Sequence, residues 1–212
     1  MQDILWEIEK AVNEFDRKGV EGLTRKAIEE KVDPVVIFDK LKEAITLVGE
    51  AFSKGEIFLP QLVGASDAME GGMPVIIKEI QKQGKKVRSL GTVAIGTVFG
   101  DIHSIGKTMV ATLLAAEGFL VKDLGINVPA GKFVEVVKEG EADVLAMSAL
   151  LTTTAPEQHK VIEMLKERNL RDKIKVIVGG GSITQEFADE IGADGYSSTA
   201  PSAGALLKRL LK

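Results

Sequence analysis

One of the two histidines in this 212-residue chain lies in a segment whose residue types could carry chemistry. The segment, GTVFGDIHSIGKTMV, places Asp101 two residues before His103 and Gly106 three residues after it. A neutral imidazole binds a metal through one ring nitrogen, and a carboxylate that accepts a hydrogen bond from the other nitrogen fixes its tautomer. We therefore expect Asp101 to orient His103, and Gly106 to let the chain turn tightly into a following helix.

Two simpler interpretations of this region are open. A motif this short also arises by chance, and a lone histidine is more often an ordinary polar side chain than a ligand. Lys107 and Thr108 follow Gly106 as they would in a phosphate-binding loop, but the first glycine of that loop would be residue 101, which is Asp. The second histidine, His159, lies in a charged helical pattern, which predicts a solvated helix face.

The C-terminal part of the chain alternates between short apolar runs and helical patterns, which predicts an α/β fold with a parallel sheet covered on both faces. The length favours a doubly wound, flavodoxin-like five-stranded sheet in the order 2-1-3-4-5, with ligands at the carboxyl ends of its strands. The expected strands are residues 91–98, 119–125, 143–150, 174–180 and 195–196.

Further candidates for a binding site follow the later strands, and parallel strands would bring them to the edge that carries His103. A run of glycines at a strand end either lets a ligand approach the backbone or makes a tight connection without a ligand. The candidate residues are Ser148, Leu150, Thr152, Gly179, Gly180, Gly181, Tyr196 and Ser197.

Residues up to about 84 show helical periodicity instead, and predict a small antiparallel bundle of four helices. Asp33 before Pro34 predicts a helix start. Gly71, Gly72 and Pro74 should weaken or kink the fourth helix. We expect two domains, a helical bundle over residues 1–86 and an α/β domain over 87–212, joined by a solvated basic linker at 82–88.

Composition limits the function classes. Hydrophobic residues make up 45% and charged residues 27% of the chain, and the net charge is −4. Nucleic-acid binding needs a basic face, so we expect no nucleic-acid partner. The chain has no cysteine, which excludes disulfides, thiolate zinc sites and cysteine-bound iron–sulfur clusters. The N-terminus is unlike a signal peptide and no apolar run could span a bilayer, so we expect a cytoplasmic protein without membrane contact.

Taken together, the Asp-x-His-x-x-Gly motif, Ser148-x-Leu150 and the Gly179–Gly180 pair at successive strand ends resemble the cobalamin-binding fold. The helical half resembles the bundle that precedes this fold in corrinoid methyl-carrier proteins and in the cobalamin region of methionine synthase. The segment GEIFLPQLVGASDAM resembles the part of that bundle that caps the cofactor.

The resemblance implies roles for the residues around the histidine. His103 would replace the cofactor's own dimethylbenzimidazole as the lower ligand of cobalt, the state called base-off/His-on. Asp101 would be the catalytic residue that modulates the proton of His103, and Gly106 would let the loop pass under the corrin. Ser104 stands where Asp is frequent in the family, but its hydroxyl can still bond to the histidine relay or to water.

The resemblance also implies roles for the residues farther from the histidine. The residues at the ends of the later strands would make room for the displaced nucleotide tail of the cofactor. Phe58 and Met69, in the bundle, would lie near the upper face, and their other interpretation is packing in the bundle core.

As a function, the resemblance implies a carrier rather than a complete enzyme. It would take a methyl group from a substrate-specific methyltransferase and present it to an acceptor methyltransferase that serves tetrahydrofolate or coenzyme M, with a reductive activase as a further partner. The alternatives are a cobalamin-dependent sensor and regulator, the small subunit of a cobalamin isomerase, and a flavodoxin-like domain without cobalamin. The sequence does not favour one methyl donor.

Overall fold

The structure is a computed structural model that describes residues 2–84 and 89–212. The chain divides into two compact units, residues 1–88 with 115–118, and residues 89–114 with 119–212. We call them the helical unit and the α/β unit. The expected boundary at residues 86 and 87, and most of the expected linker, lie outside the described residues.

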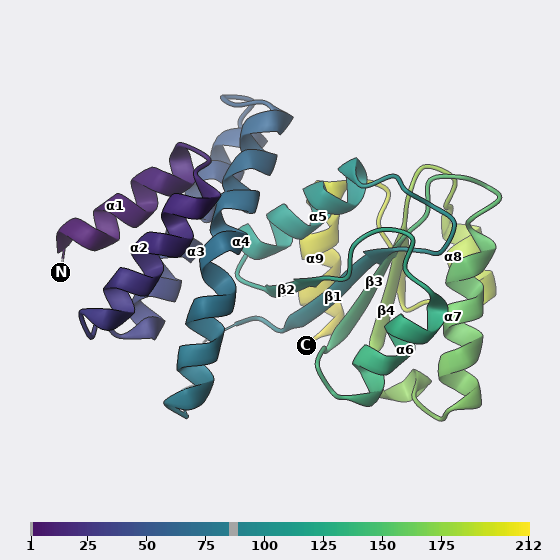
Figure 1. Ribbon diagram of the computed structural model, residues 1–212. Coiled ribbons are helices and arrows are strands. Elements are labelled where there is room, and N and C mark those ends of the chain that lie inside the picture. Colours follow the sequence, from purple (N-terminus) through teal and green to yellow (C-terminus); the bar gives the residue numbers. More distant parts are fainter. Residues whose placement is uncertain (1, 85–88) are drawn as a thin grey trace. The chain divides into compact units, whose positions relative to one another are not determined.

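Four helices lie in the N-terminal part of the helical unit that the structure describes, as the periodicity predicts (Figure 1). Asp33 caps the third helix by accepting a hydrogen bond of 2.9 Å from the Val35 amide, and Pro34 is its first residue, so the predicted helix start is confirmed. Apolar side chains from all four helices, such as Ile8 and Leu62, are fully buried. The helices are α1 (Gln2–Asn13), α2 (Arg17–Glu29), α3 (Pro34–Ser53) and α4 (Leu59–Lys82).

The fourth helix continues without a break through the glycines and the proline that were expected to weaken it. A Cβ atom on Gly71 would lie 2.4 Å from the carbonyl oxygen of Arg17, and one on Gly72 would lie 2.8 Å from Thr24 Oγ1. The two glycines therefore allow α4 to pack closely against α2. This packing outweighs the low helix propensity of the segment.

The α/β unit contains a five-stranded parallel sheet in the order β2-β1-β3-β4-β5, which confirms the predicted order. The strand register places Thr97, Ser148 and Gly179 side by side at the carboxyl ends of β1, β3 and β4. The strands are β1 (Thr92–Thr97), β2 (Leu120–Asp123), β3 (Val144–Ser148), β4 (Lys175–Gly179) and β5 (Gly195–Tyr196).

Helices cover both faces of this sheet (Figure 1). Val93 and Ile95 pack with α5 and α9 on one face, whereas Ala94 and Leu145 pack with α6, α7 and α8 on the other. Successive strand residues thus serve opposite cores, which is why the strands are almost continuously apolar. The helices are α5 (Ile105–Ala116), α6 (Ala130–Lys138), α7 (Pro156–Glu167), α8 (Gln185–Ile191) and α9 (Ala200–Leu210), and a 3₁₀ turn, η1, spans Arg171–Lys173.

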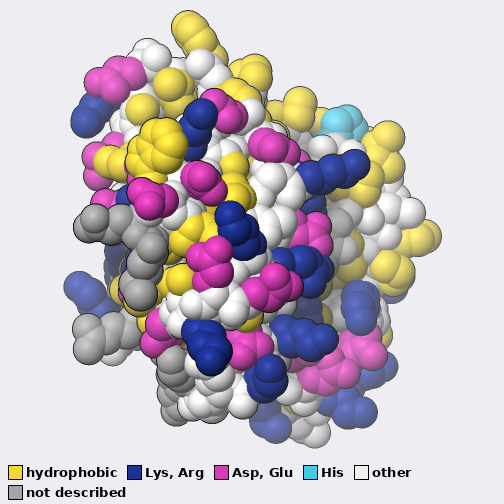
Figure 2. Space-filling model, turned by 60° about the vertical axis from the view of Figure 1, so that its left-hand side comes forward, with side chains coloured by type: hydrophobic (Ala, Val, Ile, Leu, Met, Phe, Trp, Pro, Cys, Tyr) yellow, Lys and Arg dark blue, Asp and Glu magenta, His cyan; other side chains and the backbone are white. Residues whose placement is uncertain are grey.

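Figure 2 shows acidic and basic side chains interspersed on the face in view, with apolar side chains among them. No helix in the described ranges combines the length and the apolar character that a membrane crossing requires.

Candidate functional site

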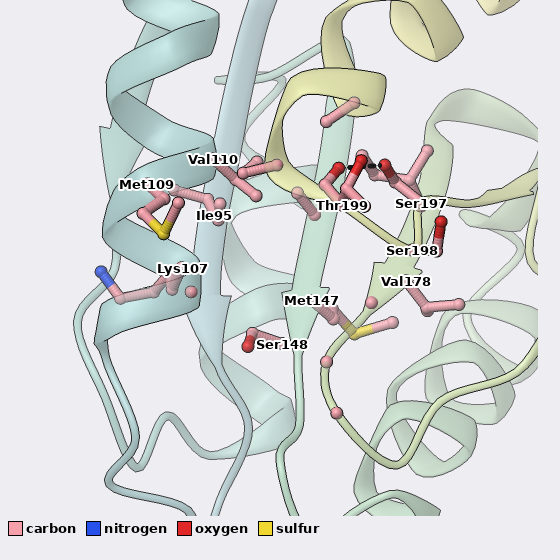
Figure 3. Close-up of a pocket in the computed structure, with 18 of the residues that line it drawn as sticks. Ile95, Lys107, Met109, Val110, Met147, Ser148, Val178, Ser197, Ser198 and Thr199 are labelled. Atoms are coloured by element: carbon pink, nitrogen blue, oxygen red, sulfur yellow. Dashed lines mark hydrogen bonds between the residues drawn. The ribbon is translucent and has the colours of Figure 1, made fainter. Parts of the chain in front are cut away.

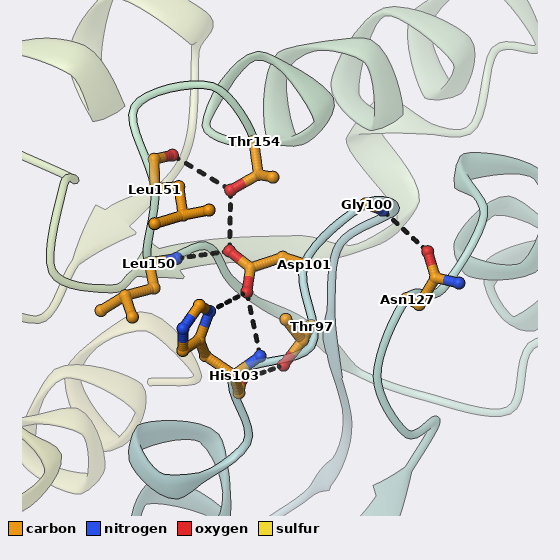
Figure 4. Close-up of polar contacts among 8 residues, drawn as sticks. All are labelled: Thr97, Gly100, Asp101, His103, Asn127, Leu150, Leu151 and Thr154. Carbon is orange, nitrogen blue, oxygen red and sulfur yellow. Dashed lines mark hydrogen bonds and ion pairs between the residues drawn. The ribbon is translucent and has the colours of Figure 1, made fainter.

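The loop between β1 and α5 brings Asp101 and His103 together, as the motif predicts (Figure 4). His103 Nδ1 lies 2.7 Å from Asp101 Oδ1, and the His103 amide donates to the same oxygen at 3.0 Å. Asp101 is buried, with 1% of its surface exposed, whereas the side chain of His103 is 49% exposed. The pair therefore has a buried acidic end and an accessible imidazole end.

The second oxygen of Asp101 binds the loop that follows β3. Asp101 Oδ2 accepts a hydrogen bond of 2.7 Å from the Leu150 amide and another of 2.7 Å from Thr154 Oγ1. The sequence singled out Thr152 in the run of three threonines, but Thr152 is exposed, and Thr154 is the buried one that reaches the site. The three threonines are adjacent and identical, so the sequence alone could not show which of them reaches Asp101.

The pKa of the Asp101 carboxyl is set by opposing effects. Burial alone would raise the pKa, but four hydrogen bonds, the largest effect coming from the His103 amide, hold it well below the ordinary value of 3.8. The carboxylate is therefore ionised and accepts all four of these hydrogen bonds. An ionised Asp101 places the imidazole proton on Nδ1, so in the neutral ring Nε2 carries the lone pair that can bind a metal.

Gly106 does not make the tight turn that was expected of it, so that prediction is wrong. It lies in the first turn of α5 with an ordinary helical backbone, and the glycine with a left-handed φ in this loop is Gly100, at 78°. A Cβ atom on Gly106 would meet nothing within 4 Å. Next to it, the carbonyl oxygen of Ser104 accepts from the Thr108 amide at 2.8 Å, at the start of α5.

A cavity of about 400 Å³ opens at the carboxyl edge of the sheet (Figure 3). Its walls come from the ends of β1, β3 and β4, the first turns of α5, and the segment that leads into α9. Six of the fourteen predicted site residues are brought together here. The predicted residues that line it are Gly106, Ser148, Gly179, Gly180, Gly181 and Ser197.

Other predicted residues lie elsewhere in the structure. Tyr196 packs against the core beneath α8 and does not line the cavity. Its side chain points to the face of the sheet opposite the one on which it was expected. Leu150 contributes its amide to Asp101, and 41% of its surface is exposed. In the helical unit, Phe58 is 74% exposed just before α4, and Met69 is buried among the helices.

The glycine run after β4 is also needed for backbone packing. Gly180 has a φ of 126°, and a Cβ atom there would lie 1.9 Å from the carbonyl oxygen of Ala149. A Cβ atom on Gly181 would lie 2.8 Å from Leu150 Cδ1. These glycines let the loop after β4 approach the loop after β3 closely, which supports the interpretation as a tight connection. The approach of a ligand to this backbone stays a prediction.

Lys107 was not predicted as part of the site. It is 4% exposed, lines the cavity, and forms an ion pair with Asp123 at the end of β2. In the sequence it stood out only as part of an incomplete phosphate loop. Its partner follows 16 residues later at the end of β2, which the strand order places next to β1 and the start of α5.

The α/β unit and the helical unit each match a known family model. Residues 91–203 and residues 5–77 each match a model described as a B12 binding domain. Over 99% of its length the chain is 44% identical to the trimethylamine corrinoid protein of Methanosarcina barkeri, covering 97% of that protein. It is 42% identical to dimethylamine corrinoid protein 1 of Methanosarcina acetivorans, over 99% of this chain and 98% of that one.

Solved structures show the same relationship. The crystal structure of the methanol:cobalamin methyltransferase complex MtaBC from M. barkeri matches 99% of this chain and 80% of that one, at 31% identity and a TM-score of 0.79. The M. barkeri monomethylamine corrinoid protein matches 99% of both chains, at 32% identity and a TM-score of 0.55. With whole-chain identity above 40% to corrinoid proteins and a B12 binding domain matched in each unit, the chain belongs to the family of cobalamin-binding corrinoid proteins.

Proposed function

We propose that this protein binds its corrinoid through Nε2 of His103, in the base-off/His-on state, and carries a methyl group between two methyltransferases. The observation that carries the proposal is the contact of 2.7 Å between His103 Nδ1 and the buried Asp101 carboxylate. This contact leaves Nε2 as the nitrogen with a lone pair, on a side chain that is half exposed.

The residues present fit such a cofactor. A corrinoid would bring its own ring ligands for cobalt, so one imidazole, that of His103, is the group that the chain would have to add. Large apolar side chains are exposed on the loop that carries Asp101 and His103 and at the start of α5, with exposed fractions of 70% for Ile102, 67% for Ile105 and 49% for Phe99. They offer apolar surface to a flat macrocycle beside His103.

The cavity supports the base-off part of the proposal. Displacement of the cofactor's own base by His103 would leave a nucleotide tail to be accommodated by the protein. The cavity lies at the same edge of the sheet as His103, and serine hydroxyls at Ser148 and Ser197 and the bare backbone of the glycine run line it. We propose that these residues hold the tail.

When bound, the corrinoid supplies the cobalt that accepts and releases the methyl group. The chain's own residues prepare the ligand for that exchange. Asp101 keeps the proton on Nδ1 of His103. It also stabilises the imidazole when the electron density on the ring changes, because the ring keeps an ionised carboxylate as its partner. The buried hydrogen bonds from Leu150 and Thr154 keep Asp101 in place throughout.

The names of the relatives suggest the partners. Relatives are named for trimethylamine and dimethylamine, and a solved relative is part of a methanol:cobalamin methyltransferase complex. We therefore propose a substrate-specific methyltransferase for a small methylated compound, with methylamines as the first donors to test. An acceptor methyltransferase for coenzyme M or tetrahydrofolate, and a reductive activase, complete the proposed system.

The test is reconstitution with hydroxocobalamin, followed by reduction to Co(II) and electron paramagnetic resonance. Coupling of cobalt to an imidazole nitrogen is expected in the parent protein and in His159→Ala, whose altered histidine lies exposed on α7, and is expected to be lost in His103→Ala. Failure of the parent to bind hydroxocobalamin, or retention of the coupling in His103→Ala, would overturn the proposal.

A further inference from the structure

We infer that residues 123–128, which connect β2 to α6, clamp the His103 loop at both of its ends, and that Asn127 is a positioning residue for His103. We call these residues the clamp segment. The effect of the clamp on cobalt rests on the function proposed above, but the clamp itself can be tested in the protein without cofactor.

At the upstream end, Asn127 makes two hydrogen bonds to the residues that lead into the motif (Figure 4). Asn127 Oδ1 accepts from the Gly100 amide at 2.8 Å, and the Asn127 amide donates to the carbonyl oxygen of Asp101 at 2.9 Å. The two bonds fix the backbone of Asp101, whose carboxylate holds His103, and of the residue just before it. Asn127 therefore acts on the imidazole through Asp101 and does not touch it.

The backbone at position 127 favours asparagine. Asn127 has a φ of 53°, in the left-handed region that most L residues avoid and that asparagine tolerates. Glycine would also adopt this conformation, but it has no side chain to accept from Gly100. The backbone requirement and the side-chain requirement can therefore be separated by a single substitution to glycine.

The clamp segment is itself held to the sheet. The Thr97 amide donates to the carbonyl oxygen of Gly125 at 3.0 Å, and the Val128 amide donates to that of Thr97 at 3.0 Å. An isolated bridge between Val98 and Val128 extends the pairing of β1 past the end of β2. The segment is thus a continuation of the sheet edge rather than a free loop, and it can resist movement of what it holds.

At the downstream end, the same segment holds the first turn of α5. Asp123 pairs with the buried Lys107 and also accepts from the Gly125 amide at 2.8 Å. Lys107 follows His103 by four residues, so the loop is fixed on both sides of the histidine. Between the two ends, Thr97 Oγ1 donates to the carbonyl oxygen of His103 at 3.0 Å.

Fixing both ends reduces the conformations open to the histidine before a ligand binds, so less entropy is lost on binding. Direct hydrogen-bond partners of a metal-binding histidine change metal affinity by about 10–100-fold. Asn127 is one residue further from the imidazole, so we expect a smaller change, of about 3–10-fold in affinity for hydroxocobalamin.

The first experiment measures amide hydrogen exchange of the cofactor-free protein in Asn127→Gly and in a matched control, Asn169→Gly. Asn169 also has a left-handed φ, of 55°, but it follows α7, at the amino ends of the strands, whereas His103 lies at their carboxyl ends. Asn127→Gly should speed exchange of the Gly100 amide about fivefold and of the His103 amide about two- to fivefold, with no change at either amide in Asn169→Gly.

The His103 amide decides the outcome, because it bonds to Asp101 and not to Asn127. Faster exchange at Gly100 alone would show a local contact and would overturn the positioning role. Equal changes in Asn169→Gly would overturn it as well. Asn127→Asp, which keeps an acceptor and tolerates the same backbone, should restore protection at both amides.

A second variant tests the downstream end. Asp123→Asn removes the charge that pairs with Lys107, and it should also speed exchange of the His103 amide. Glu141→Gln is the control, because it removes an ion-pair partner from the neighbouring residue on the same strand, Lys122. Unchanged exchange at His103 in Asp123→Asn would show that the segment acts at one end only and would overturn the two-ended clamp.

The cobalt measurement uses hydroxocobalamin-loaded protein reduced to Co(II). Asn127→Gly should lower the fraction of cobalt that is coupled to an imidazole nitrogen, whereas Asn169→Gly should match the parent. An unchanged fraction would overturn the positioning role. If the parent itself does not bind hydroxocobalamin, the function proposed above fails, and hydrogen exchange still decides whether the clamp exists.

Discussion

Thr154 Oγ1 donates a hydrogen bond of 2.7 Å to Asp101 Oδ2, from a loop that lies 53 residues further along the chain. The same hydroxyl lies 3.0 Å from the carbonyl oxygen of Leu151, within its own loop. Asp101 therefore connects the histidine loop to the start of α7. A hydrogen bond to a buried charged acceptor contributes more than one between neutral groups.

Thr154→Val should destabilise the cofactor-free protein by about 1.5–3 kcal/mol, because it leaves Asp101 with one donor fewer while keeping the shape of the side chain. Urea denaturation would measure the change. Thr154→Ser should recover most of the loss, since it restores the hydroxyl. A Thr154→Val protein as stable as the parent would show that the bond contributes nothing.

The lowered pKa of Asp101 predicts how stability depends on pH. A carboxyl with a lower pKa in the folded than in the unfolded protein binds its proton less readily when folded, so its contribution is present above the ordinary value of 3.8 and is lost as the pH falls. The test compares two proteins that both carry His103→Ala, one with Asp101 and one with Asp101→Asn. The protein with Asp101 should have the higher free energy of unfolding. The difference should be constant between about pH 5 and 7 and smaller below about pH 4. A difference that grows in acid would contradict the pKa direction.

Two glycines at the cavity should respond oppositely to alanine. Gly180→Ala forces a side chain onto a φ of 126° and against the carbonyl oxygen of Ala149, so we expect a loss of about 3 kcal/mol or more. Gly106→Ala meets open space in a helix and should leave stability unchanged or raise it by up to about 1 kcal/mol. Thermal unfolding distinguishes the two.

The same pair tests the cavity as a binding site. Gly106→Ala should weaken binding of hydroxocobalamin even though the protein stays folded, because the added methyl group occupies space at the cavity wall. Equal affinity in Gly106→Ala and the parent would place the bound tail away from that wall.

Arg171 links the residue before β4 to the turn before β5, at the amino ends of the strands. It donates to the carbonyl oxygens of Ile174 and Gly192, and to Asp194 Oδ2 at 2.7 Å. Arg171→Lys cannot make this forked set of bonds and should cost about 1–3 kcal/mol. Affinity for hydroxocobalamin, measured by titration under native conditions, should stay at the parent value, and a matching loss of affinity would refute the separation of the amino and carboxyl ends of the strands.

Local patterns were enough to predict the sheet and the first contact of the site. The alternation of apolar runs and helical patterns predicted a parallel sheet, and the length favoured its strand order. The spacing of Asp101 and His103 predicted their pairing, because the two residues are neighbours in sequence. The role of Gly106 was wrong because the chain turns at Gly100 instead. Tyr196 illustrates a second limit, since the last strand is too short for its pattern to show which face a side chain takes.

The unpredicted contacts connect loops that are distant in sequence. Thr154, Asn127 and Lys107 have ordinary residue types for their positions, and their partners are set by the strand order. Their roles follow from which loops lie next to one another, and no local pattern carries that information. For Gly71 and Gly72 the reason was close packing between helices, which helix propensity alone does not describe.

After β1 the chain crosses to β2 on one side, and after β3 it crosses to β4 on the other side. The connections that follow these two adjacent strands therefore run in opposite directions along the sheet. A parallel sheet with this reversal has a recess at that point whatever its side chains are. Moving the histidine site into another protein of the same topology would therefore require more than the short motif. The smallest portable unit is the loop after β1 together with Asn127 and residues 150–154, whose donors complete the surroundings of Asp101.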